Sequence, residues 1–174
     1  MRLSALSKIV AVVGLFLVPG GCASTRPGDR RSIEVTIHVA ASPAKVWEAL
    51  TTEPLNSEFW AHEWRFESDW KTGSTVTYYA ADGSLYSRGR VIEAAVGRTL
   101  AYTWPPPGGE TSGNEPEVIR WNLSQSGPGV VRLSMVHERL PDAVAARCAE
   151  GWALVLSSLK SLLEVGAPLK YDPK

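Results

Sequence analysis

One histidine stands out as a residue that could carry acid–base chemistry. In the run VVRLSMVHERL (residues 130–140) alternate positions are apolar, and His137 shares their face with Met135. Alternation with a period of two predicts a strand with one buried face. An inward-facing His137 could act as a general acid or base, contact a ligand, or donate a structural hydrogen bond. The same alternation directs Glu138 outward, so a His137–Glu138 dyad is not expected.

Large aromatic residues are stronger candidates for a function than the histidine. The 174-residue chain has seven Trp, and rings of this size either fill a core or line a pocket for an apolar ligand. So many rings between a sheet and one helix favour an aromatic-lined pocket. The loop-like run PPPGGETSGNEP (residues 105–116) is expected to cover it. The predicted ligand-binding residues are Trp64, Tyr102, Trp104, Trp121, Met135, His137 and Trp152.

Other chemistry-bearing patterns are not found in the sequence. It has no Gly-rich phosphate loop, CxxC pair or HExxH motif, so we expect no metal and no cofactor. Lys and Arg total 18, as do Asp and Glu, and nothing in this balance indicates a nucleic-acid partner. Cys148 lies on the apolar side of a predicted helix with no suitably spaced histidine, which indicates a small buried hydrophobe. No catalytic residue is predicted.

A long helix near the C-terminus must position these residues. In PDAVAARCAEGWALVLSSLKSLLEVG (residues 141–166) apolar residues recur at steps of three and four, which predicts one buried helix face. Pro141 is expected in the first turn, and Gly166 with Pro168 is expected to stop the helix. The predicted buried face comprises Val144, Cys148, Trp152, Leu156, Leu159 and Leu163.

The preceding chain is predicted to form one strand, two short helices and about six further strands. The strand covers residues 32–40, and the helices cover 43–51 and 52–60. The later strands are expected at 63–69, 74–80, 86–95, 99–104, 117–125 and 130–139. Ser42 and Pro43 predict a helix start, and Asp82-Gly83 predicts a hairpin turn. Antiparallel strands with segregated helices indicate an α+β fold.

The first residues are predicted to be an export signal. A basic start (MRLSALSK), ten apolar or Gly positions (IVAVVGLFLV) and PGGCAS are typical of a secretory signal peptide. Cys22 after Gly20-Gly21 resembles a bacterial lipoprotein box, although Pro19 occupies a position where that box usually has an aliphatic residue.

This N-terminal pattern predicts a four-part chain. We expect a signal peptide at 1–21, a lipidated tether at 22–31, a domain at 32–167 and a tail at 168–174. Cys22 would anchor the domain to a bacterial membrane in the cell envelope. The alternatives are a soluble secreted protein, or a cytoplasmic one whose start codon is misassigned.

Five segments in order resemble the SRPBCC or START-like superfamily, in particular its Hsp-90 ATPase activator homologue-like branch. They are IEVTIHVAASPAKVWEALT (33–51), FESDWKTGSTVTYY (66–79), GRVIEAAVGRTLAYTW (89–104), VVRLSMVHERL (130–140) and GWALVLSSLKSLLEVG (151–166). The resemblance implies a helix-grip fold, with a seven-stranded antiparallel sheet wrapped around the C-terminal helix. It also implies binding of a small hydrophobic ligand in an internal cavity, without catalysis.

Two other functions remain open. The first is a polyketide cyclase-like or lyase-like enzyme that uses His137 as its acid or base. The second is a protein-interaction or chaperone-regulating module whose interior is filled, with a partner that the sequence does not identify. The eukaryotic activators carry a separate N-terminal domain that we expect to be missing here, and an exported protein would not meet a cytosolic chaperone. Hsp-90 activation is therefore the least expected role.

Overall fold

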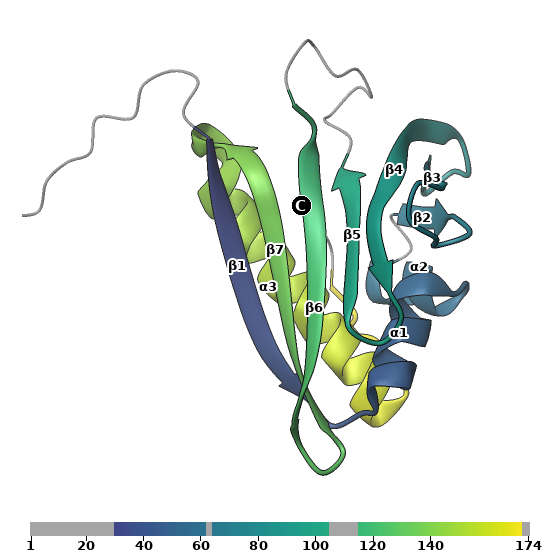
Figure 1. Cartoon of the computed structure of the whole chain (residues 1–174), viewed down its shortest axis with the longest axis vertical. Coiled ribbons are helices and arrows are strands. Elements are labelled where there is room, and N and C mark those ends of the chain that lie inside the picture. The colour runs from purple at the N-terminus through teal and green to yellow at the C-terminus, as the bar shows by residue number, and fades with distance from the viewer. Residues whose placement is uncertain (1–29, 62–63, 105–114, 172–174) are drawn as a thin grey trace, which may run out of the picture.

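Seven strands wrap around one long helix, α3. The computed structural model describes residues 30–61, 64–104 and 115–171. In chain order the elements are β1 (Arg30–Val39), α1 (Pro43–Thr51), α2 (Leu55–Phe59), β2 (Trp64–Glu67), β3 (Thr75–Ala80), β4 (Leu85–Ala95), β5 (Thr99–Trp104), β6 (Glu117–Gly127), β7 (Val130–Pro141) and α3 (Asp142–Val165) (Figure 1). The α+β class and the predicted order of elements are confirmed.

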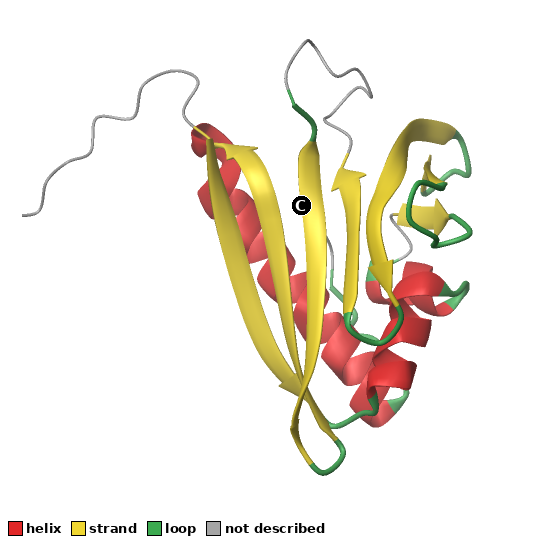
Figure 2. Ribbon diagram, viewed as in Figure 1, coloured by secondary structure: helices red, strands yellow, loops and turns green. Residues whose placement is uncertain are grey.

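All seven strands belong to one antiparallel sheet. Their order across the sheet is β1-β7-β6-β5-β4-β3-β2. Figure 2 shows α3 lying across one face of this sheet, with α1 and α2 beside its C-terminal half. This is the helix-grip arrangement that the sequence resemblance implied.

The sheet bends sharply within β4, near Gly89. In the pairing of β3 with β4 the register shifts between Tyr78 and Tyr79 of β3. In the pairing of β4 with β5 it shifts between Val91 and Glu93 of β4. Such irregularities bend and twist a strand. A Cβ added at Gly89 would lie 2.5 Å from Oγ1 of Thr103 and 2.8 Å from its carbonyl oxygen. Figure 1 shows β4 as a curved strand that leads from β5 over towards β3 and β2. Glycine therefore permits the close approach that folds β2, β3 and β4 back over the interior.

The short helix α1 begins as the sequence predicts. Ser42 is its N-cap, and the Ser42 hydroxyl accepts a hydrogen bond of 3.3 Å from the backbone N–H of Lys45. Pro43 occupies the first helical position, where its missing N–H loses no helical bond. Val46, Ala49 and Leu50 bury one face of the helix. This cap fixes where the chain turns from β1 into the two helices that flank α3.

The limits of α3 differ slightly from the prediction. The backbone of Pro141 is extended (ψ 135°), so it ends β7 and precedes the helix instead of lying in the first turn. Gly166 ends the helix in the left-handed conformation (φ 81°), and its N–H donates to the carbonyl of Leu162 at 3.0 Å. A left-handed C-terminal residue of this kind favours glycine. The predicted stop is therefore confirmed, and the start moves by one residue.

The buried stripe of α3 is wider than the sequence predicted. Trp152, Leu156 and Leu159 are buried as expected, whereas Val144, Cys148 and Leu163 are only partly buried. The additional buried residues are Ala145, Val155, Ser158 and Leu162. Besides the sheet, α1 and α2 pack against α3 beside its C-terminal half, so this part of the helix meets two layers.

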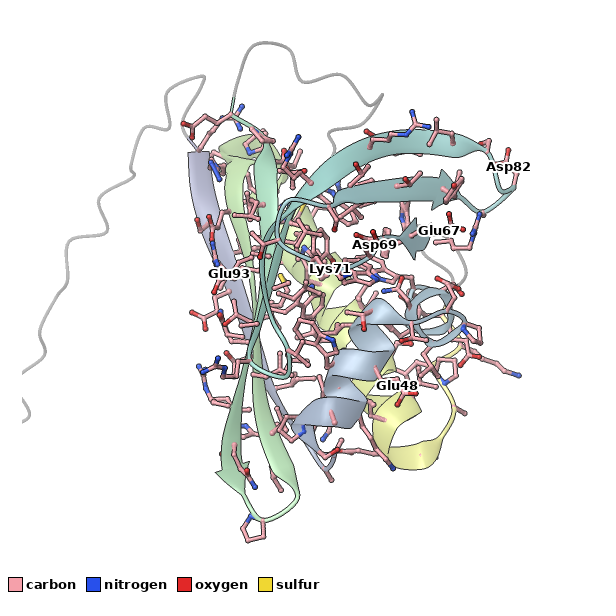
Figure 3. The ribbon with its side chains drawn as sticks, turned by 45° about the vertical axis from the view of Figure 1, so that its right-hand side comes forward. Glu48, Glu67, Asp69, Lys71, Asp82 and Glu93 are labelled. Atoms are coloured by element: carbon pink, nitrogen blue, oxygen red, sulfur yellow. The ribbon has the colours of Figure 1, made fainter. Side chains whose placement is uncertain are left out.

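The outer face of the sheet carries ion pairs. Arg120 on β6 pairs with Glu93 at 2.8 Å and with Glu138 at 3.0 Å, and Figure 3 shows Glu93 pointing away from α3. Glu138 therefore faces outward, as strand alternation predicts. No helix among the described residues is long and apolar enough to cross a membrane.

Candidate functional site

Trp104, the last residue of β5, lies at the centre of a group of aromatic rings. It stacks on Trp60, with ring centroids 5.6 Å apart and planes inclined by 20°. Trp64, Phe66, Tyr78, His137 and Trp152 approach the same ring at an angle, with centroids 5.8 to 6.2 Å away. Figure 3 shows the interior between the sheet and the helices filled with side chains. We call Trp60, Trp64, Phe66, Tyr78, Trp104, Trp121 and Trp152 the aromatic cluster.

The structure brings together the residues that the sequence predicted as a site. The ring of Trp121 lies 5.7 Å from that of Trp152, and the Trp121 indole N–H donates to the hydroxyl of Tyr102 at 3.1 Å. Met135 is the register partner of Trp121 on the neighbouring strand. Trp64 joins this group through Trp104. That these residues bind a ligand remains a prediction.

Three members of the aromatic cluster were not among the predicted site residues. Phe66 and Tyr78 are register partners on β2 and β3, and their rings meet edge to face at 5.3 Å. The parity of β2 could have identified Phe66, because it lies two residues after Trp64 on the same face. Trp60 follows a five-residue helix, which is too short for a periodic pattern to place its side chain.

His137 is held by two hydrogen bonds from opposite sides. Its Nδ1 lies 3.1 Å from the indole Nε1 of Trp152, and its Nε2 lies 2.9 Å from Oε2 of Glu117. An indole nitrogen can only donate, so Nδ1 must be the acceptor. The proton of the neutral ring therefore resides on Nε2 and is donated to the Glu117 carboxylate. Only 3% of the His137 surface is exposed, and neither ring nitrogen is left free.

Glu117 is a partner that sequence reasoning missed. Glu138, the acidic neighbour in sequence, bonds to Arg120 on the outer face. Ile119 on β6 is the register partner of His137, and Glu117 lies two residues earlier on the same inward face. The sequence predicted that Ile119 and Trp121 face inward. Because alternate residues of a strand share a face, the same pattern could have indicated that the Glu117 side chain also points inward, towards the imidazole.

The hydroxyls of Tyr78 and Tyr102 are buried near the rings. Tyr78 donates a hydrogen bond to the carbonyl of Thr103, and Tyr102 accepts one from Trp121. Burial raises the pKa of both hydroxyls well above its ordinary value. Both tyrosines are therefore neutral at physiological pH and offer hydroxyl groups rather than charges.

Cys148 shows no sign of an activated nucleophile. Burial raises the pKa of its thiol above the ordinary value, the nearby Glu117 carboxylate raises it further, and Arg147 acts in the opposite sense. The thiolate needed for attack is thus disfavoured. The side chain packs against the core but remains partly exposed, so it is less enclosed than the sequence suggested. The described residues hold no group of three or more His, Cys, Asp or Glu suited to a metal ion.

Several sequence predictions fall outside the described residues, among them the signal peptide at 1–21 and most of the tether at 22–31. The lipidation site Cys22 precedes the described part of the chain. Most of the loop expected to cover the rings, residues 105–114, also lies outside it. All of these therefore stay predictions.

The fold and its inward-facing rings define a helix-grip protein of the SRPBCC type. A sequence model of the family described as "Activator of Hsp90 ATPase homolog 1-like protein" matches residues 40–164. The chain belongs to this family. No curated protein matches the chain.

Solved structures share the fold at low sequence identity. A conserved protein of unknown function, EF2215 from Enterococcus faecalis, has a TM-score of 0.64 at 19% identity, covering 81% of this chain and 77% of its own. The Aha1 dimer from Colwellia psychrerythraea has 0.63 at 23%, covering 78% and 97%. PFC0360w, an HSP90 activator from Plasmodium falciparum, has 0.63 at 18%, covering 80% and 99%. At these identities the likeness shows the fold alone.

Proposed function

We propose that the protein binds a small hydrophobic ligand at the aromatic cluster, between the sheet and α3. The observation that carries this proposal is the state of Trp104, which contacts six rings and nevertheless remains partly exposed. Trp64 is partly exposed as well. A core built only for stability would enclose such rings, whereas a binding site presents them to a ligand.

The energetics of such a site are favourable. Burial of about 300 Å² of apolar ligand surface at roughly 25 cal/mol per Å² contributes about 7 kcal/mol before ordering costs. The rings of the aromatic cluster come from β2, β3, β5, β6, α3 and the end of α2, so their positions are fixed by the fold. Such preorganisation lowers the entropic cost of binding.

The arrangement of His137 supports binding over acid–base catalysis. A general base needs a free lone pair within reach of the substrate. In His137 the Nδ1 lone pair accepts from Trp152, and the Nε2 proton is donated to Glu117. The imidazole therefore serves as a fixed hydrogen-bonded wall of the proposed site.

Equilibrium dialysis against 2-ethylnaphthalene tests the proposed function. We expect saturable binding by the wild-type protein and at least tenfold weaker binding by Trp104→Ala. Trp47→Ala is the matched control, because Trp47 lies on α1 and makes no ring contact with the aromatic cluster. Circular dichroism verifies that each variant is folded. Absence of wild-type binding to this probe, to fatty acids and to aromatic polyketides would contradict the proposal.

We also propose that Cys22 carries a lipid that anchors the domain to the bacterial cell envelope. The sequence pattern at residues 1–22 supports this localisation. Labelling of cells with a palmitate analogue is expected to mark the wild-type protein and the Cys148→Ala control but not Cys22→Ala. If Cys22→Ala is labelled like the wild type, the anchor is wrong.

A chaperone-regulating role is the second candidate. The family to which the chain belongs favours it, as does the likeness to an HSP90 activator. Addition of the purified domain to a bacterial Hsp90 homologue, with ATP hydrolysis as the readout, tests this candidate. Stimulation together with failure of every hydrophobic probe to bind would favour this role over the binding function.

A further inference from the structure

Several buried donors of the aromatic cluster are paired with acceptors inside the protein. The indole N–H of Trp121 is accepted by Tyr102, and that of Trp152 is accepted by His137. The hydroxyl of Tyr78 is accepted by a backbone carbonyl. Two buried oxygens, Oδ1 of Asn56 on α2 and Oγ of Ser158 on α3, have no partner among the described residues, and neither bonds to a ring of the aromatic cluster.

Trp60 is left without an acceptor. Its Nε1 is buried and has no hydrogen-bond partner among the described residues, and only 8% of the side chain is exposed. The ring lies 5.1 Å from Trp152 and 5.6 Å from Trp104, in the middle of the aromatic cluster. Buried donors without a partner are rare in native proteins, and each one needs an explanation.

Tyr102 contributes a second donor. Its oxygen accepts from Trp121, but among the described residues nothing accepts the proton of its own hydroxyl. Burial raises the pKa of this hydroxyl, so the proton stays in place. The Trp121 and Trp152 rings, 5.7 Å apart, connect Tyr102 with the part of the aromatic cluster that holds Trp60.

The two acceptors on His137 and Glu117 already have donors, so bonding to Trp60 would break an existing hydrogen bond. If Nδ1 of His137 accepted from Trp60, the indole of Trp152 would lose its partner. The Glu117 carboxylate already accepts from Nε2 of His137. His137 and Glu117 therefore offer no spare acceptor, and the indole N–H of Trp60 is left for an acceptor that a ligand can bring.

We propose that the ligand is an uncharged hydrophobic molecule with a carbonyl oxygen, which accepts the indole N–H of Trp60. This inference rests on the proposed function and specifies the ligand class. A neutral oxygen fits better than a carboxylate, because the Glu117 carboxylate next to His137 repels an anion. The hydrocarbon part of the ligand lies against Trp104, and the carbonyl reaches inward to Trp60.

A pair of probes with nearly the same shape tests the inference. 2-Acetylnaphthalene and 2-ethylnaphthalene differ in a carbonyl that replaces a methylene. We expect the ketone to bind the wild-type protein about tenfold more tightly, within the roughly 5- to 100-fold range of a hydrogen bond that satisfies a buried donor. 2-Naphthoate is expected to bind more weakly than the ketone.

The variant Trp60→Phe keeps an aromatic ring and removes the N–H. We expect it to bind both naphthalenes with equal affinity, while the control Trp47→Phe keeps the tenfold preference. A second readout needs no variant: in ¹⁵N-labelled wild-type protein, the Trp60 indole proton is expected to shift downfield with the ketone and not with the hydrocarbon.

The outcomes separate this inference from the proposed function. Equal wild-type affinity for the two probes, or a preference that survives in Trp60→Phe, overturns the carbonyl inference and leaves hydrophobic binding intact. A Trp60 indole proton that does not move with bound ketone also overturns it. If neither naphthalene binds, the proposed function fails, and the carbonyl inference fails with it.

Discussion

The indole nitrogen of Trp152 and Nδ1 of His137 lie 3.1 Å apart, so that α3 and β7 are joined by a hydrogen bond inside the core. Most contacts between a helix and a sheet are apolar and tolerate small shifts. A buried hydrogen bond has a defined distance and direction. This one fixes the central part of α3 against the strand that carries His137.

Removal of this donor is expected to destabilise the protein. Trp152→Phe keeps a ring in the aromatic cluster but leaves Nδ1 of His137 unsatisfied, at a cost of about 1–3 kcal/mol. Urea denaturation followed by circular dichroism measures the change. Trp47→Phe, which removes an indole N–H outside the aromatic cluster, is expected to cost less. Equal losses in the two variants would contradict the role given to the hydrogen bond.

Two glycine-to-alanine substitutions are expected to change the stability of the protein in opposite directions. At Gly89 a new methyl group collides with Thr103 and the ring of Tyr78, so Gly89→Ala should lose about 1–3 kcal/mol. At Gly151, inside α3, an added Cβ meets nothing within 4 Å. Gly151→Ala should gain about 0.5–1 kcal/mol from its higher helix propensity. Thermal denaturation of both variants provides the comparison, and a stabilised Gly89→Ala would refute the close approach at the bend.

Truncation of one leucine tests the grip of the sheet on α3. Leu159 has no exposed surface, and Leu159→Ala is expected to lose about 2–5 kcal/mol of unfolding free energy. Leu154 on the same helix is 46% exposed, and Leu154→Ala should change stability by less than about 1 kcal/mol. Urea midpoints measure both effects. Similar losses at the two positions would mean that α3 is not held by its inner face.

The buried tyrosines predict a loss of stability at alkaline pH. Burial keeps the pKa of the Tyr102 hydroxyl above its ordinary value of 10.0. As the pH rises through about 10, the unfolded chain releases this proton and the folded chain retains it. The stability that is present below pH 10 therefore falls, by up to about 1.4 kcal/mol per pH unit for each such tyrosine. Urea midpoints between pH 8 and 11 should decline less steeply for Tyr102→Phe than for Tyr79→Phe; equal slopes would contradict the assignment.

Local sequence patterns were sufficient for most of the fold. The cap at Ser42, the alternation of β6 and β7 and the left-handed stop at Gly166 all depend on residues close together in the chain. The start of α3 was misplaced by one residue because Pro141 can end a strand as well as begin a helix. The extra buried residues Val155 and Leu162 depend on α1 and α2, which no local pattern places.

The site was predicted less completely, for a related reason. Trp104, Trp121 and Trp152 lie on regular strands or a helix, so their periodicity placed them in the interior. Trp60 follows a short helix, and its position depends on tertiary packing. The pair of His137 with Glu117 required the register between β6 and β7, which the length of the intervening turn does not determine by itself.

The bend at Gly89 divides the residues of the aromatic cluster between two sides of the fold, which we expect to open separately. Trp60, Trp64, Phe66 and Tyr78 come from the side of α2, β2 and β3, whereas Trp104, Trp121 and Trp152 come from the side that holds α3. β2 is a four-residue edge strand, while β6 and β7 pair along most of their length. Separation of the two sides would uncover the rings without breaking a hydrogen bond between β6 and β7. Amide hydrogens of β2 and β3 should therefore exchange through a low-energy opening, and those of β6 and β7 only through global unfolding.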